Sequence, residues 1–97
     1  MPEPLRERLS AAASSFLDRA PAASESTEGA ALNDRIASAL VEFAAGEYRL
    51  GFETLTSNLY EFEVALTQGE FDGLLALGQE VGLPPGDCSF LSELVRA

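Results

Sequence analysis

The sequence contains no histidine and no lysine, and it has a single cysteine, Cys88. Without histidine, the chain lacks the commonest general base and the commonest metal ligand, so a serine or cysteine nucleophile has no usual activating partner. One cysteine cannot form an internal disulfide, which favours a cytosolic protein. We interpret Cys88 as a small apolar residue near a helix start rather than a reactive thiol, because no histidine or lysine lies nearby in sequence to activate it.

Long apolar runs and catalytic motifs are missing as well. Residues 1–20 place charged residues on both sides of a short, weakly apolar run, which is unlike a signal peptide, and no run approaches the length of a membrane span. The chain has no phosphate-binding loop, no glycine-rich dinucleotide-binding loop and no zinc-ligand spacing. These absences predict a cytoplasmic protein that is not an enzyme, holds no cofactor or metal and does not enter a membrane.

Cationic residues are scarce: 6 arginines stand against 16 aspartates and glutamates, and the net charge is -10. Nucleic acids and anionic membranes are polyanions that proteins bind mainly through basic side chains, so direct binding to either is disfavoured. The same charge attracts a basic partner, accelerates its approach and suits a basic cleft on its surface. The composition therefore predicts a basic protein partner and no nucleic-acid partner.

A chain of 97 residues with 46% apolar content is expected to make one domain. Apolar residues recur at helical spacing along most of it, and no stretch alternates for long enough to predict a strand with conviction. Helices are expected over residues 4–19, 30–45, 48–66 and 67–81, with a short last helix capped by Asp87. We therefore predict an all-α fold, a compact bundle of four to five short helices.

The front of the chain differs from the rest in composition. Residues 1–20 contain an alanine-rich first helix, whose thin apolar stripe predicts weak packing, and residues 21–29 are small and polar, as in a flexible linker. Residues 30–97 carry stronger stripes and are expected to form the helical core. Within that core, Gly46 stands where a helix should end, and Gly51 inside a helix indicates a close helix crossing.

The longest helical pattern covers residues 48–66 and predicts one buried face. That face is formed by Tyr48, Phe52, Leu55, Leu59 and Phe62. The last turns nevertheless carry Glu61 and Glu63, although the negative end of the helix dipole disfavours carboxylates there. Together with Tyr60 they make an acidic and aromatic patch that the fold does not require. Residues 62–66 form an extended segment in the alternative interpretation.

The candidate partner-binding residues are Tyr60, Glu61, Glu63, Glu70 and Asp72. Each also has a purely structural interpretation. Tyr60 can be a half-buried tyrosine of the core edge, and Glu61 and Glu63 can belong to a solvated helix face. Glu70 and Asp72 fall in the first turn of the next helix, where carboxylates favour the dipole, and Glu70 also completes a capping box. A small enzyme that uses these acidic pairs with a metal is disfavoured, because a chain this acidic contains such pairs by composition alone.

Three segments carry a family resemblance: GEYRLGFETL at 46–55, SNLYEFEVALTQGEFDGLLALGQEVGL at 57–83 and FLSELV at 90–95. A helix ends in a Leu-Tyr-acid-aromatic-acid run and is followed by a capping threonine, an acidic helix start, a Gly-Leu-Pro stop and a Phe-Leu finish. In this order the chain from residue 41 onwards resembles the MafI family of bacterial immunity proteins. The first helix and the linker lie outside the resemblance.

The resemblance implies a small cytosolic protein that binds and neutralises the toxic C-terminal domain of a polymorphic toxin, and so protects the producing cell and its siblings. Family members accompany contact-delivered or secreted toxins, nucleases among them. We therefore expect a monomer that binds its toxin domain one to one, with an acidic face over a basic active site. The alternative is a non-catalytic helical adaptor or a self-associating interaction domain.

Overall fold

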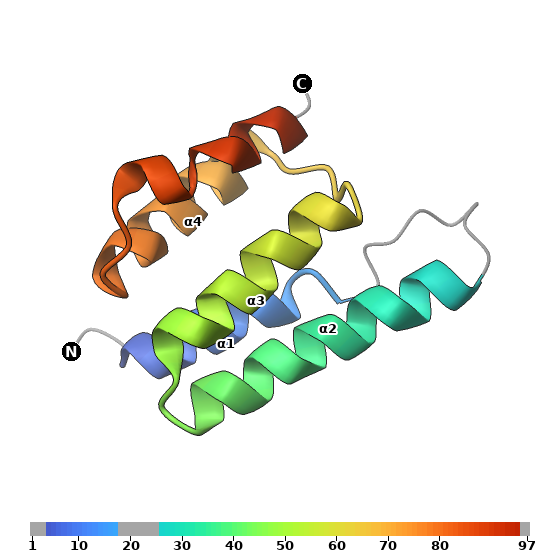
Figure 1. The fold of residues 1–97 in the computed structure, drawn as a ribbon, viewed down its shortest axis with the longest axis horizontal. Helices are drawn as coiled ribbons and strands as arrows, with labels where there is room; N and C mark the ends of the chain where they lie inside the picture. The colour runs from blue at the N-terminus through green and yellow to red at the C-terminus, as the bar shows by residue number, and fades with distance from the viewer. Residues whose placement is uncertain (1–3, 18–25, 96–97) are drawn as a thin grey trace.

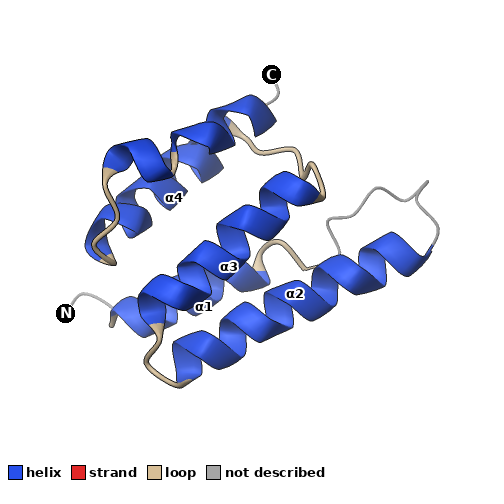
Figure 2. Cartoon of the chain, viewed as in Figure 1, coloured by secondary structure: helices blue, strands red, loops and turns tan. Residues whose placement is uncertain are grey.

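The computed structural model describes residues 4–17 and 26–95, which are almost entirely helical (Figures 1 and 2). The elements are α1 (Leu5–Ser14), α2 (Ser26–Ala44), α3 (Tyr48–Glu61), α4 (Gln68–Glu80) and two 3-10 helices, η1 (Pro85–Asp87) and η2 (Ser89–Leu94). The described part of the chain contains no strand, only an isolated bridge between Leu66 and Val95. The prediction of an all-α bundle in a single domain is confirmed.

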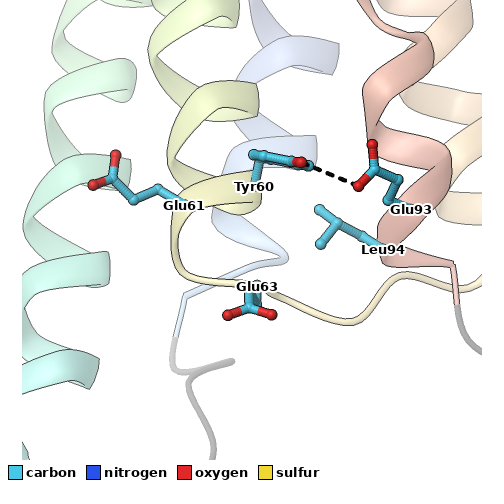
Figure 3. Close-up of a pocket in the computed structure, with 5 residues that line it drawn as sticks. All are labelled: Tyr60, Glu61, Glu63, Glu93 and Leu94. Carbon is cyan, nitrogen blue, oxygen red and sulfur yellow. Dashed lines mark hydrogen bonds between the residues drawn. The ribbon is translucent and has the colours of Figure 1, made fainter.

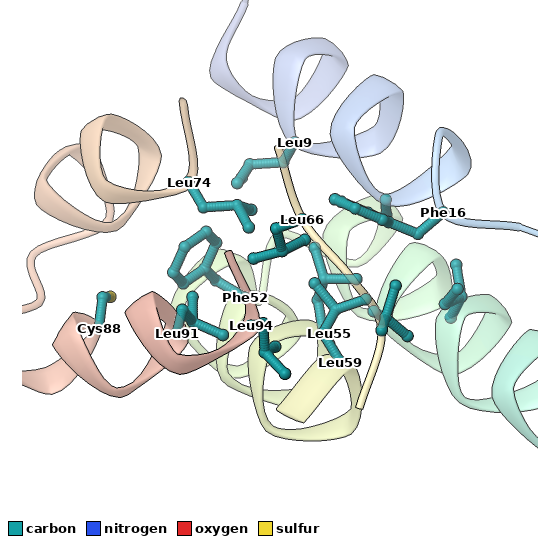
Figure 4. Close-up of a cluster of buried hydrophobic side chains, with 14 of the residues drawn as sticks. Leu9, Phe16, Phe52, Leu55, Leu59, Leu66, Leu74, Cys88, Leu91 and Leu94 are labelled. Atoms are coloured by element: carbon teal, nitrogen blue, oxygen red, sulfur yellow. The ribbon is translucent and has the colours of Figure 1, made fainter. Parts of the chain in front are cut away.

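Helix α3 lies at the centre of the bundle. It contacts α1 and α2 on one side and η2 on the other, and α4 with the 3-10 helices forms the remaining layer (Figure 1). The predicted buried face is confirmed, since Phe52, Leu55 and Leu59 are fully buried, while Tyr48 and Phe62 at its two ends are half-buried. Figure 4 shows side chains from α1, α4 and η2 meeting this face.

The close crossing predicted at Gly51 is confirmed. A Cβ atom there would lie 2.7 Å from the Phe43 ring and 3.1 Å from the Ala39 carbonyl oxygen, both on α2. Gly78 has a similar role on α4, because a Cβ atom would lie 2.8 Å from Cys88 Sγ and 3.2 Å from the Phe52 ring. Glycine therefore lets α3 approach both of its neighbouring layers.

Helix α1 ends, and helix α2 begins, earlier in the chain than predicted. Helix α1 ends at Ser14 and residues 15–17 form a turn, so the prediction that this helix continues to residue 19 is wrong for residues 15–17. Residues 18 and 19 lie outside the described residues. Helix α2 begins at Ser26, so residues 26–29 of the expected linker are helical, and residues 21–25 lie outside the described residues. The packing of α1 is closer than its thin stripe predicted, because Leu9, Ala13 and Phe16 are all buried.

The end of the chain also differs from its prediction. Asp87 does not cap a helix but closes η1, with its N–H bonded to the Pro84 carbonyl at 3.0 Å. Cys88 occupies the position before η2 and makes no side-chain cap. A 3-10 helix suits this segment, because its tighter winding turns Leu91 and Leu94, three residues apart, onto the same buried face. None of the described helices has the length and apolar character needed to cross a membrane.

Candidate functional site

Helix α3 ends at Glu61 and does not continue through the next five residues, so the predicted end of this helix is wrong. The backbone N–H of Glu63 donates to the Tyr60 carbonyl at 3.1 Å, and that of Val64 donates to the Leu59 carbonyl at 3.0 Å. These two bonds form a Schellman motif, which ends a helix by placing one residue in the left-handed region. That residue is Glu63, with φ of 51°.

The same motif ends α2 and α4, where glycine holds the left-handed position. Gly46 and Gly82 have φ of 86° and 93°, and the N–H groups of Glu47 and Leu83 bond back into their helices at 2.8 and 2.9 Å. Left-handed backbone costs a residue with a side chain roughly 1–2 kcal/mol. Glu63 therefore occupies a position that glycine fits better, and strained placements of this kind are frequent at functional sites.

The segment after Glu63 joins the site to the end of the chain. Val64 and Leu66 are buried while Glu63 and Ala65 are exposed, which agrees with the extended interpretation of this segment. The N–H of Leu66 donates to the Leu94 carbonyl at 2.9 Å. This bond helps to hold the end of η2 against the segment that follows α3.

Tyr60 projects from α3 towards η2 and is held there by two contacts. Its ring meets the Phe90 ring edge-on, with centroids 5.1 Å apart and planes at 86°. Its hydroxyl donates a hydrogen bond of 3.1 Å to Glu93 Oε1 (Figure 3). The residue as a whole is still 41% exposed. Tyr60 is thus an exposed aromatic group in one defined orientation.

The hydroxyl of Tyr60 is a weaker acid than usual. The hydrogen bond to Glu93 is the largest cause, and the negative charge of Glu93, partial desolvation and the charge of Glu63 add to it, so all four raise the pKa of Tyr60 above its ordinary value of 10.0. The phenol therefore remains protonated, and a hydrogen-bond donor, throughout the physiological pH range.

Tyr60, Glu61 and Glu63 line one cleft of about 330 Å³, together with Glu93 and Leu94; we call it the Tyr60 cleft. Figure 3 shows the Glu93 carboxylate facing the Tyr60 hydroxyl, Glu61 pointing away from Tyr60 on the other side of α3, and Glu63 on the loop below. The Glu61 and Glu63 carboxylates have no hydrogen-bond or ion-pair partner within residues 4–17 and 26–95. Both carboxylates are exposed and available to a partner.

The two remaining candidates lie elsewhere. The Glu70 carboxylate accepts the Thr67 N–H at 2.9 Å and the Thr67 hydroxyl accepts the Glu70 N–H at 3.1 Å, so the predicted capping box is confirmed. Asp72 accepts a bond of 2.9 Å from Gln68 Nε2. Glu70 lines a different cleft, of about 150 Å³, with the end of α1, and neither carboxylate lines the Tyr60 cleft.

The sequence did not reveal what η2 contributes: Glu93 and Leu94 line the cleft, and Phe90 contacts the Tyr60 ring. Glu93 stands 33 residues after Tyr60, and no local pattern links the two. The available signal was the FLSELV segment, where an exposed glutamate is flanked by residues that pack on the core. That pattern does not reveal which surface residue the glutamate meets.

The side chains of the Tyr60 cleft suit the recognition of a cationic group. Its carboxylates can pair with cations, and the Tyr60 ring can receive an arginine or lysine head group. Across the described residues, no three histidine, cysteine, aspartate or glutamate side chains are grouped so that they could hold a metal ion. Cys88 is buried, and burial followed by the charge of Asp87 raises the pKa of its thiol, which opposes thiolate formation.

Comparison of the chain with models of protein families, with curated proteins and with solved structures finds no match.

Proposed function

We propose that this chain is an immunity protein, which binds and neutralises the toxic C-terminal domain of a cognate toxin by placing the Tyr60 cleft against a basic surface. The observation that carries the proposal is the fixed, exposed ring of Tyr60 beside the unpaired carboxylates of Glu61 and Glu63. An aromatic anchor surrounded by charges is the usual composition of a strong protein interface.

The charge distribution supports a basic partner on this side of the molecule. Every charged residue between Arg49 and Arg96 is a carboxylate, and this stretch includes all of α4, η1 and η2. Within it, Glu53 and Glu80 are paired with Arg49 and Arg8. The carboxylates of the Tyr60 cleft thus lie in a negative field that would steer a cationic surface towards them.

Inhibition of this kind needs affinity and no chemistry in the inhibitor. A domain that cuts nucleic acid needs a basic groove for its substrate, and an acidic helical protein can block that groove. A toxin that kills at low copy number requires a Kd of about 1 nM or lower, and stable interfaces bury about 1,200–2,000 Å² in total. The Tyr60 cleft would therefore be the centre of a larger contact surface. Glu70 and Asp72 are not placed in this centre, because both lie on α4 and neither lines the Tyr60 cleft.

The test begins with capture of the tagged protein's partner from the producing cell, followed by calorimetric titration at 50 and 300 mM NaCl. We expect one-to-one binding to a basic protein, weakened by salt. Coexpression should restore the growth of cells that make the captured toxic domain. The variant Glu61→Lys/Glu63→Lys should slow association at least tenfold and reduce this protection.

The matched control is Asp34→Lys/Asp87→Lys, which changes the net charge equally at exposed positions outside the cleft. If the control weakens binding as much as the cleft variant, total charge and not the Tyr60 cleft determines affinity. If neither variant affects binding to a captured toxin, the partner contacts another surface. A partner with no toxic activity would contradict the immunity function itself.

A second candidate function is self-association or an adaptor role, and two exposed apolar side chains favour it. Val41 on α2 is 68% exposed and Leu50 on α3 is 50% exposed. Helical adaptors and homodimers bury such residues at their interfaces. Light scattering at 1 mM protein separates the two functions: a monomer contradicts self-association, whereas a dimer that Leu50→Glu dissociates supports it.

A further inference from the structure

The Tyr60 cleft contains two kinds of carboxylate. Glu61 and Glu63 have no partners in the described chain, whereas one oxygen of Glu93 accepts the hydrogen bond from the Tyr60 hydroxyl at 3.1 Å. All three nevertheless line the same cleft. The three carboxylates therefore share one cleft but differ in their contacts: Glu93 is already hydrogen-bonded to Tyr60, whereas Glu61 and Glu63 are not bonded within the described chain.

Glu93 stands on an element that is itself fixed. Its neighbours Leu91 and Leu94 are buried at 0% and 3% exposure, and the Leu94 carbonyl accepts the Leu66 N–H at 2.9 Å. Phe90, from the first turn of the same element, supplies the edge-on ring contact to Tyr60. The backbone that carries Glu93 is thus anchored in the core.

Resting on the proposed function, we propose that Glu93 is a positioning residue that fixes the Tyr60 ring for the partner, while Glu61 and Glu63 meet the partner's cations directly. A tyrosine that is free to change rotamer loses that freedom on binding, and this loss weakens the complex. Here the Glu93 hydrogen bond and the Phe90 ring remove the freedom beforehand. The 3-10 helix η2 becomes the second half of the binding surface.

The division of roles predicts that replacing a glutamate by glutamine, which has the same shape but no charge, affects binding at positions 61 and 63 and not at position 93. Glu93→Gln keeps an oxygen that accepts the Tyr60 hydroxyl, so it should leave the dissociation rate of the complex unchanged. Glu93→Ala removes the acceptor and should raise that rate about 2- to 10-fold. Glu61→Gln and Glu63→Gln remove charges that contact the partner, so each should weaken binding although its shape is kept.

The first measurement needs no partner. The chain has two tyrosines and no tryptophan, so in a Tyr48→Phe background the absorbance of tyrosinate reports Tyr60 alone. The groups that face its hydroxyl are Glu93 and Glu63. We expect the pKa of Tyr60 to fall part of the way towards its ordinary value in Glu93→Gln and further in Glu93→Ala, with Glu61→Gln as the unaffected control. NMR couplings should show one χ1 rotamer in the parent and in Glu93→Gln, and averaging in Glu93→Ala.

The second measurement uses the basic protein captured by the tagged chain, with association and dissociation rates recorded for the same variants. Equal titration of Tyr60 in all variants, or one rotamer retained in Glu93→Ala, would overturn the positioning role whatever the partner does. Equal dissociation rates for Glu93→Gln and Glu61→Gln would overturn the division of roles. Failure to capture any basic toxin contradicts the proposed function, and the titration and rotamers then still decide whether Glu93 fixes the ring.

Discussion

Glu63 shows at the scale of one residue how the fold and the proposed function compete. Among the described residues, three helices end in Schellman motifs, and the left-handed positions are Gly46, Glu63 and Gly82. Gly46 and Gly82 suit this position, because glycine adopts left-handed backbone without steric cost. The third places an unpaired carboxylate on the rim of the Tyr60 cleft, where its charge serves the proposed interface and its backbone conformation is unfavourable.

The variant Glu63→Gly tests this competition. Relief of a left-handed cost of about 1–2 kcal/mol exceeds the entropic penalty of glycine, about 0.5–1 kcal/mol, so the free energy of unfolding should rise by about 0.5–1 kcal/mol in a urea titration. The same variant should bind the captured partner more weakly. The reciprocal control is Gly46→Ala, which has open space around its Cβ position and should lose stability through backbone strain alone. A loss of stability in Glu63→Gly would contradict the strain assigned to this residue.

At the scale of elements, the sequence correctly predicted the features that depend on residues close together in the chain. The capping box of Thr67 and Glu70, the helix end at Gly46 and the close crossing at Gly51 depend on a few neighbouring residues, and the structure confirms all three. The predicted end of α3 at residue 66 was wrong, because the apolar residues keep their helical spacing past Glu61, where the helix ends. What interrupts it is the burial of Val64 and Leu66 and the pairing of Leu66 with the end of η2, which lies far along the chain.

The candidate site divides in the same way. Tyr60, Glu61 and Glu63 were predicted together because they are adjacent in sequence, and they line one cleft. Glu70 was grouped with them as a candidate, and it instead lines a cleft with the end of α1. Glu93 could not be predicted, because its contact with Tyr60 depends on how two layers of the bundle meet.

The ion pair between α1 and α4 gives a prediction at this scale. Arg8 donates to both carboxylate oxygens of Glu80, one of them at 2.6 Å, and this pair links the alanine-rich first helix to the last α-helix. The hydrogen bonds from Arg8 lower the pKa of Glu80 below its ordinary value of 4.5, with desolvation opposing and the charge of Arg8 assisting. The depressed pKa means that the pair stabilises the fold when the carboxylate is ionised.

We therefore compare unfolding of the parent chain and of Glu80→Gln by urea from pH 7 to pH 3. The stability difference should be constant above about pH 5, where Glu80 is ionised in both the folded and unfolded states, and it should disappear as the pH falls through the lowered pKa. The expected size is small, because the pair is partly solvent-exposed. A difference that persists at pH 3 would show that Glu80 acts through packing and not through its charge.

At the scale of the whole molecule, the net charge of -10 has opposite effects on folding and on binding. Carboxylates gathered on one compact chain repel each other, which destabilises the folded state, and they attract a basic partner over distances longer than a contact. Added salt screens both effects, with a Debye length of about 10 Å at 0.1 M. The free energy of unfolding should therefore rise between 50 and 300 mM NaCl while the affinity for the captured partner falls.

The variant Asp34→Lys/Asp87→Lys separates the effect of the total net charge from the effect of the carboxylates in the Tyr60 cleft. Its smaller net charge should reduce the gain in stability that salt gives, whereas its affinity should keep most of the salt dependence, because the Tyr60 cleft is unchanged. Chemical denaturation by urea at each salt concentration measures the first quantity, and calorimetry measures the second. If the stability of the parent chain instead fell with salt, the carboxylates would act on the fold more through stabilising ion pairs than through mutual repulsion, and the repulsion assigned to the net charge would be contradicted.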